Sequence, residues 1–239
     1  MEKCFVACMK HDFEPHFKEA SRLYAFPLKP SQPRNGEFII LDSGAFALSL
    51  KKKEIDLPYM KRLHGYYRKY GASNNFPVLC IAPDKFLDPE KTMQNYRTWM
   101  HFFKLPVVPV IQFTKMKHLD IFHARKQAMY YREFGNNIIA VSNPGLKGSA
   151  ALPLKILTEE LRKIGYEWIH NLGAGWNYND CRDWRKLGFD SIDSISYYTD
   201  AEHNVGWRPF SYETGIMNAE KMEIVKHNYK LANDGFRNN

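Results

Sequence analysis

The sequence predicts an α/β fold with a parallel sheet, because apolar strand-like runs alternate with helical segments about seven times along the chain. The chain has 239 residues, close to the ~250 residues typical of a closed barrel of eight strands and eight helices. Polar residues end these apolar runs one after another, as they do at the carboxyl-end rim of such a barrel. We therefore expect one compact domain over residues 1–239, a TIM-like (β/α)8 barrel, with a doubly wound open sheet as the alternative architecture.

Strands are expected where apolar residues run together between turn residues. In chain order the runs are CFVACM from Cys4, FIILD ending at Asp42, PVLCIAPD ending at Asp84, VVPVIQ ending at Gln112, NIIAVSN ending at Asn143, WIHNLGAG ending at Gly175 and FDSIDSIS ending at Ser196. A barrel needs one strand more than this pattern provides. Residues 203–217 could supply that strand or form a lid.

Helices are expected between these runs, where helical periodicity is bounded by proline or glycine. Pro58 suits a first turn, and Gly135, Gly165 and Gly188 close three of the segments. In chain order the expected helices cover residues 14–25, 57–70, 89–103, 119–134, 152–164, 179–187 and 218–232.

The composition predicts a soluble, basic protein of the cytoplasm, or of the host cytoplasm if a phage encodes it. No apolar run approaches ~18 residues, and the first residues lack a signal peptide, so no membrane association is expected. Lysine and arginine number 34 and aspartate and glutamate 26, for a net charge of +8. A basic surface favours nucleic acid as a partner.

Neither a metal nor a dinucleotide cofactor is expected. Cys4, Cys8 and His11 have a suggestive spacing, but they fall in an apolar strand-like run without a fourth ligand. Four scattered cysteines also make a disulfide framework improbable. No G-x-G-x-x-G segment follows the first strand, which disfavours a dinucleotide fold.

Six polar strand ends in succession predict an active site at one rim, although each alone could be a cap or a satisfied buried group. The residues at these ends are Asp42, Ser43, Asp84, Gln112, Ser142, Asn143, Asn171, Gly173, Gly175 and Asp193. One aspartate could attack an anomeric carbon while a second moves protons. Amides and a third aspartate could read the edge of a heterocycle, with Phe46 stacked on its face. This inventory suits a base-exchanging glycosyl transferase; an aldolase or isomerase would usually need a strand lysine or a metal.

Two segments carry a resemblance to a known family. ILDSGAF at residues 40–46 resembles the Asp-Ser-Gly-Gly-Phe segment of the tRNA-guanine transglycosylase superfamily. Residues 170–196 resemble that family's later segment, in which a glycine-rich strand end and a short helix precede a strand with the nucleophilic aspartate. The order of Asp84, Gln112 and IAVSNPG between them also matches, so the resemblance spans residues 38–200.

The resemblance implies a role for each strand-end residue. Asp193 would be the nucleophile at C1′ of the nucleotide, with Asp190 as its rival, and Asp42 would be the general acid/base. Asp84 and Gln112 would bind the guanine or 7-deazaguanine ring, and Phe46 would stack on it. The remaining substrate-binding positions would be Ser43, Ser142, Asn143, Gly173 and Gly175.

Departures from the family pattern shift the expected acceptor from tRNA to DNA. The zinc site of three cysteines and a histidine is missing, since no cysteine follows Cys181. Residues 144–148 carry no acid for an aminomethyl group. A short, zinc-free, basic relative most resembles the DNA-guanine transglycosylases of phage and bacteria. This resemblance implies free 7-cyano-7-deazaguanine as donor and guanine in DNA as acceptor, with tRNA as the runner-up.

Phosphates could be held by the lysines at 51–53, together with Arg182, Arg185, Lys186 and Arg208. The sequence leaves open whether helper proteins open the DNA. Two other classes also remain. One is a catalytically silent subunit that binds nucleic acid, and the other is a barrel enzyme for a small phosphorylated sugar, with Gly173 and Gly175 near an anion.

Overall fold

The computed structural model describes residues 3–8, 21–30, 38–71, 77–143, 151–173, 184–194 and 227. Within these ranges eight strands form one sheet in the order β4-β3-β2-β1-β8-β7-β6-β5, and every pairing is parallel. The strands are β1 Lys3–Cys8, β2 Ser21–Ala25, β3 Ile39–Asp42, β4 Val78–Cys80, β5 Val110–Ile111, β6 Ile138–Ser142, β7 Trp168–Leu172 and β8 Ser191–Ser194.

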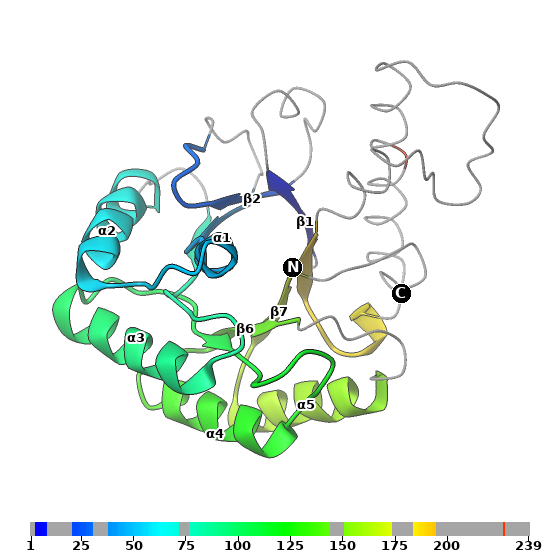
Figure 1. Cartoon of the computed structure of the whole chain (residues 1–239). Coiled ribbons are helices and arrows are strands. Elements are labelled where there is room, and N and C mark those ends of the chain that lie inside the picture. The colour runs from blue at the N-terminus through cyan, green and yellow to red at the C-terminus, as the bar shows by residue number, and fades with distance from the viewer. Residues whose placement is uncertain are drawn as a thin grey trace.

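Five helices accompany the sheet within the described ranges. They are α1 Ala45–Leu50, α2 Leu57–Gly71, α3 Pro89–Phe102, α4 Ile121–Arg132 and α5 Ala151–Ile164. Figure 1 shows α2 to α5 as an arc outside the strands, whereas the short α1 lies inside that arc. Each long helix connects two parallel strands, as crossover connections require. No helix in the described ranges has the length and apolarity needed to span a bilayer.

The outer face of the sheet packs against these helices through the larger apolar core. Ile39 and Leu41 of β3 lie in this core, as does Ile169 of β7. Trp99 of α3 and Leu161 of α5 meet them from the helical side, and both are fully buried. Alternate residues of each strand point to opposite faces, so their neighbours along the strands point inward.

A second apolar cluster occupies the inner face. Its buried members come from five regions of the sheet: Leu23, Phe38, Ile40, Ile81, Val108, Val110 and Ala140. The rings of Phe38, beside β3, and Trp168, on β7, have centroids 5.4 Å apart, although β3 and β7 are not neighbours in the strand order. An isolated parallel bridge also joins Ile81, after β4, to Val108, before β5. This bridge joins residues that flank β4 and β5, the first and last strands of the sheet order.

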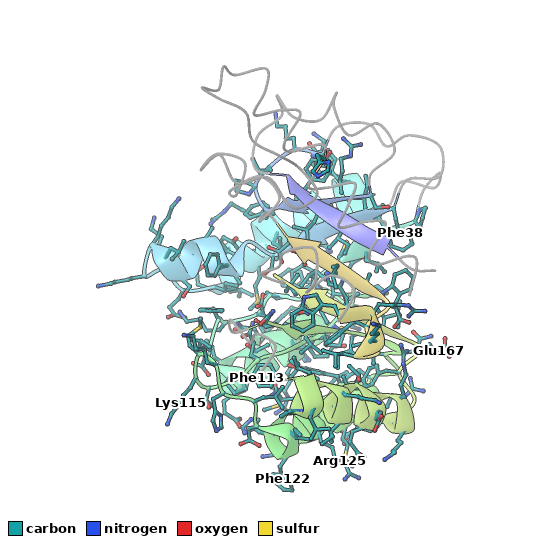
Figure 2. The ribbon with its side chains drawn as sticks, turned by 90° about the vertical axis from the view of Figure 1, so that its right-hand side faces the viewer. Phe38, Phe113, Lys115, Phe122, Arg125 and Glu167 are labelled. Atoms are coloured by element: carbon teal, nitrogen blue, oxygen red, sulfur yellow. The ribbon has the colours of Figure 1, made fainter. Side chains whose placement is uncertain are left out.

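The carboxyl ends of the parallel strands share one end of the molecule. Asp42 is the last residue of β3, Ser142 is the last of β6, and Gln112 follows β5 directly. Figure 2 shows this polarity: Lys115, beyond β5, lies at one end, and Phe38 and Glu167, which precede β3 and β7, lie at the other.

The predicted elements agree with the structure except in one segment. The expected helix over residues 14–25 is wrong at residues 21–25, which form strand β2 between β1 and β3. Tertiary pairing overrides the helical pattern there, and β2 is the strand that the sequence pattern lacked. No sequence pattern indicated α1 either. Several predictions lie outside the described residues: residues 14–20 of the expected helix 14–25, residues 174–175 and 195–196 of two expected strands, residues 179–183 of the helix 179–187, the segment 203–217 and, apart from residue 227, the helix 218–232.

Candidate active site at the carboxyl ends of the strands

A tight turn after β3 presents the first carboxylate. Gly44 adopts φ 75° and its N–H donates to Oδ2 of Asp42 at 2.9 Å. A Cβ at Gly44 would lie 2.6 Å from the carbonyl oxygen of Phe26. Glycine is required here both by the left-handed backbone and by this close approach. The turn holds Asp42 at the strand end and directs the chain into α1.

The second carboxylate, Asp84, is held by donors from two other strand ends. Its Oδ1 accepts a hydrogen bond from the Ser43 hydroxyl at 2.8 Å, and its Oδ2 accepts one from Nε2 of Gln112 at 2.7 Å. All three side chains are buried. The Gln112 amide oxygen accepts the N–H of Leu87 at 3.3 Å, which fixes the orientation of the amide. Asp84 therefore has little freedom to rotate.

Burial and mutual repulsion set the charge state of these acids. Burial raises the pKa of Asp42 from 3.8 to about 7, and the charges of Asp84 and Asp193 add to the effect. The Gly44 N–H opposes this rise, since it stabilises the carboxylate. Burial also raises the pKa of Asp84, against the hydrogen bonds from Ser43 and Gln112. Asp42 is thus able to exchange a proton near neutral pH.

The third carboxylate, Asp193 of β8, lies in a buried polar chain. Its Oδ1 contacts Nε2 of His170 at 2.9 Å and accepts the N–H of Gly173 at 3.0 Å. Nδ1 of His170 lies 2.8 Å from the hydroxyl of Ser191, which accepts a hydrogen bond from Nε1 of Trp168 at 2.7 Å. Side-chain alternation along β7 and β8 places all four side chains on the inner face.

The rival acid Asp190 lies before β8, away from this group. Its Oδ2 accepts the backbone N–H of Ile169 at 2.7 Å and lies 2.5 Å from Nη2 of Arg162. The carboxylate thus binds β7 to α5. Its contacts are structural.

Aromatic rings and lysines lie near the same end of the sheet. Phe46 of α1 is 57% exposed, and its ring meets that of Phe86 edge to face at 5.3 Å. Exposed lysines follow α1 at 51–53, and Lys115 and Lys117 follow β5. Arg185, by contrast, precedes β8, and its guanidinium donates to the carbonyl of Phe189 at 3.5 Å. Because Arg185 and Lys186 lie at the amino end of a strand, they are poor candidates for the phosphate contacts expected of them.

The other predicted site residues are distributed as follows. Ser142 is buried at the end of β6, and the N–H of the next residue, Asn143, donates to the carbonyl of Leu172 at 2.9 Å. Gly173 reaches the site through its backbone N–H. Gly175, Arg182 and Arg208 lie outside the described residues. Among the described residues no cluster of three or more His, Cys, Asp or Glu is arranged to hold a metal ion.

Sequence reasoning missed His170, Ser191 and Phe86. A single histidine inside an apolar run is usually a satisfied core residue, so His170 gave no signal alone. The period-two spacing of Ser191 and Asp193 indicates that these two side chains share one face of their strand. Only the β7–β8 register, which pairs His170 with Ser191, shows that His170 belongs with them.

Comparison with known proteins yields a likeness of fold. No family model matches the sequence, and no curated protein matches it. A chain of the BexX/CysO complex of Amycolatopsis orientalis is similar in structure, with a TM-score of 0.55 and 12% identity over 99% of this chain and 90% of that one. Orotidine 5′-monophosphate decarboxylase from Sulfolobus solfataricus gives a TM-score of 0.51 and 13% identity over 97% of this chain and 98% of its own. At such identities the likeness concerns the fold alone.

Proposed function

We propose that this protein is a pentosyltransferase that exchanges guanine in DNA for free 7-cyano-7-deazaguanine through a covalent aspartyl-nucleotide intermediate. The observation that carries the proposal is the pairing of Asp42 and Asp193 at one end of the sheet. The two acids are close enough for the charge of Asp193 to raise the pKa of Asp42. A double displacement at an anomeric carbon needs two such groups, one to attack and one to move protons.

In the first half-reaction a carboxylate oxygen of Asp193 forms a bond to C1′ as the bond from C1′ to N9 of guanine breaks. Asp42, protonated near neutral pH, gives its proton to the departing base. In the second half-reaction Asp42 takes the proton from N9 of the incoming base. That nitrogen then bonds to C1′ and releases the Asp193 carboxylate. Atoms and charge balance without a cofactor.

Asp84 and Gln112 are the proposed readers of the base. The Asp84 carboxylate retains lone pairs beyond the two that accept from Ser43 and Gln112, and these could accept the N1–H and amino group of guanine. A purine without these donors would leave the buried acid less well paired, which is a strong basis for selectivity. Phe46 and Phe86 offer rings for stacking.

The proposed scaffold is a closed (β/α)8 barrel in which the site lies at the carboxyl-end rim. Two observations support closure. The Ile81–Val108 bridge links the outermost strands β4 and β5. The contact between Phe38 and Trp168 brings together the inner faces of strands that are not neighbours in the sheet.

DNA is the proposed acceptor and tRNA the second choice. The net charge of +8 and the exposed lysines at 51–53, 115 and 117, near the site end, suit a phosphate backbone. The zinc-binding cysteines that accompany the tRNA enzymes have no counterpart after Cys181. A duplex acceptor must release its guanine from the stack before C1′ can be reached.

One observation disfavours an enzyme for small phosphorylated sugars. That class would need the glycine-rich end of β7 to bind an anion, but the N–H of Gly173 already donates to Asp193. A silent binding subunit is disfavoured because it would have no physical need for both Asp42 and Asp193 at one end of the sheet, where their charges repel.

The test is incorporation of labelled 7-cyano-7-deazaguanine into guanine-containing DNA and, separately, into tRNA. Label in DNA is expected for the unaltered protein, together with a denaturation-resistant protein–DNA adduct. Asp193→Ala should abolish both while leaving the fold intact. Asp190→Asn is the matched control, because it removes a charge from the same part of the chain at the other end of the sheet. No label in either polymer, or an adduct unaffected by Asp193→Ala, would overturn the proposal.

A further inference from the structure

We propose that His170 is a positioning residue that holds Oδ1 of Asp193 and so presents Oδ2 to the anomeric carbon; this rests on the proposed function. His170 is 1% exposed and Asp193 is 5% exposed. Their contact at 2.9 Å joins neighbouring strands. Unlike the acids at the strand ends, His170 lies within its strand, below the rim.

The hydrogen-bond chain determines which imidazole nitrogen carries the proton. The Asp193 carboxylate can only accept, so Nε2 of His170 carries the proton and donates to Oδ1. In the neutral ring Nδ1 is then unprotonated and accepts from the Ser191 hydroxyl. The Ser191 oxygen in turn accepts from the indole N–H of Trp168, which can only donate. Each buried polar atom of the chain finds a partner of the right type.

The two oxygens of Asp193 have different surroundings. Both hydrogen bonds to the carboxylate, from His170 and from the Gly173 N–H, are accepted by Oδ1. Within the described residues, Oδ2 therefore has no donor. A nucleophile that has one oxygen anchored and the other free is held in orientation without losing the lone pair that attacks.

The set of serine, histidine and aspartate could be mistaken for a hydrolase triad, but its geometry differs. Ser191 is 0% exposed and its oxygen accepts from Trp168. No substrate carbonyl can reach that oxygen. Of these three side chains, only Asp193, which is nearest the carboxyl end of β8, is placed to meet a ligand. The series of hydrogen bonds therefore runs from the core toward the carboxylate.

The experiment compares His170→Phe with His170→Gln, since the glutamine amide can place a donor near the position of Nε2. The rate of covalent adduct formation with guanine-containing DNA should fall about 100-fold in the phenylalanine variant. The glutamine variant should recover most of that loss. KM for the free base should change little in either variant, because Asp84 and Gln112 bind the base. A merely structural role would lower the melting temperature and affect kcat and KM together.

A second measurement needs no turnover. In ¹⁵N NMR spectra of the unaltered protein, the His170 ring should show a protonated Nε2 and an unprotonated Nδ1, and Asp193→Ala should remove that preference. A protonated Nδ1 in the neutral ring would overturn the inference, as would adduct formation at the normal rate in His170→Phe. Both results would leave the transglycosylase proposal standing. An unaltered protein that forms no adduct with DNA or tRNA would overturn the proposed function, and this inference with it.

Discussion

Replacing Asp42 by asparagine should make the protein more stable, by an amount that grows with pH. Asp42 has a native pKa of about 7, against 3.8 for an ordinary aspartate. Asparagine cannot ionise, yet its amide oxygen can still accept the Gly44 N–H that Asp42 accepts at 2.9 Å. The substitution thus removes the charge and keeps the turn.

The sign and size of this change in the free energy of unfolding follow from proton binding to Asp42. Between pH 3.8 and about 7 the unfolded chain has released the Asp42 proton while the native protein retains it. The unfolded state binds fewer protons there, so the free energy of unfolding falls as pH rises, by about 1.4 kcal/mol per unit. Over about three units this is about 4 kcal/mol, an upper bound because Asp84 and Asp193 share the repulsion. Asp42→Asn should recover this energy above pH 7 and gain nothing near pH 4.

Urea unfolding followed by tryptophan fluorescence at pH 5, 6, 7 and 8 measures the effect. The stability difference between variant and unaltered protein should widen by about 2 kcal/mol from pH 5 to pH 7. Asp120→Asn is the matched control for loss of one charge, because asparagine preserves its role as the exposed cap of α4. A difference that is constant with pH, or that shrinks as pH rises, would refute the placement of Asp42 beside Asp84 and Asp193 in a cluster of acids.

Three further outcomes are expected. Gly44→Ala should lower the free energy of unfolding by about 1–3 kcal/mol in urea titrations, because Gly44 has a φ of 75°. Gly65→Ala, in the open middle of α2, should instead raise the free energy of unfolding by up to about 1 kcal/mol. Equal effects of the two substitutions would contradict the inference that the backbone at Gly44 disfavours other residues. Gln112→Leu should cost about 1–3 kcal/mol by depriving Asp84 of a donor, and should weaken binding of free 7-cyano-7-deazaguanine in a fluorescence titration, where unchanged affinity would remove Gln112 from base recognition. Changing the lysines at 51–53 to glutamine should make the plot of log affinity for DNA against log salt concentration less steep, by about 0.9 for each phosphate that these side chains no longer neutralise. The affinity for the free base should not change. An unchanged slope would show that these lysines do not contact the DNA.

The sequence predicts the parallel α/β arrangement well because long helices and buried strands have strong periodic signals. The prediction for strand β2 is wrong for a physical reason, because Ser21–Ala25 is short and contains a buried arginine. Arg22 is 2% exposed on the outer face, and its guanidinium lies 5.4 Å from the ring of Tyr24. In the sequence alone, such an arginine is read as a residue on the polar face of a surface helix. The pairing of β2 with β1 and β3 decides the outcome, and this pairing is long-range information.

The acids of the candidate site could be predicted, but their partners could not. Asp42, Asp84 and Gln112 stand out because a polar residue that ends an apolar run needs an explanation. The role of His170 depends on the register between β7 and β8, which brings it to Ser191 and Asp193. The choice between Asp190 and Asp193 likewise depends on Arg162, an ion-pair partner on a helix well before β8 in sequence.

The apolar cluster on the inner face has a kinetic consequence for base exchange. Leu23, Ile40, Val110 and Ala140 are at most 6% exposed and fill the space beneath the carboxylates. In the proposed reaction a base therefore enters and departs at the end of the sheet where the acids lie. The guanine set free in the first half-reaction would have to leave before its replacement arrives, so turnover in this proposal follows a ping-pong sequence. Free guanine should compete with the incoming base and, when abundant, drive the exchange backward.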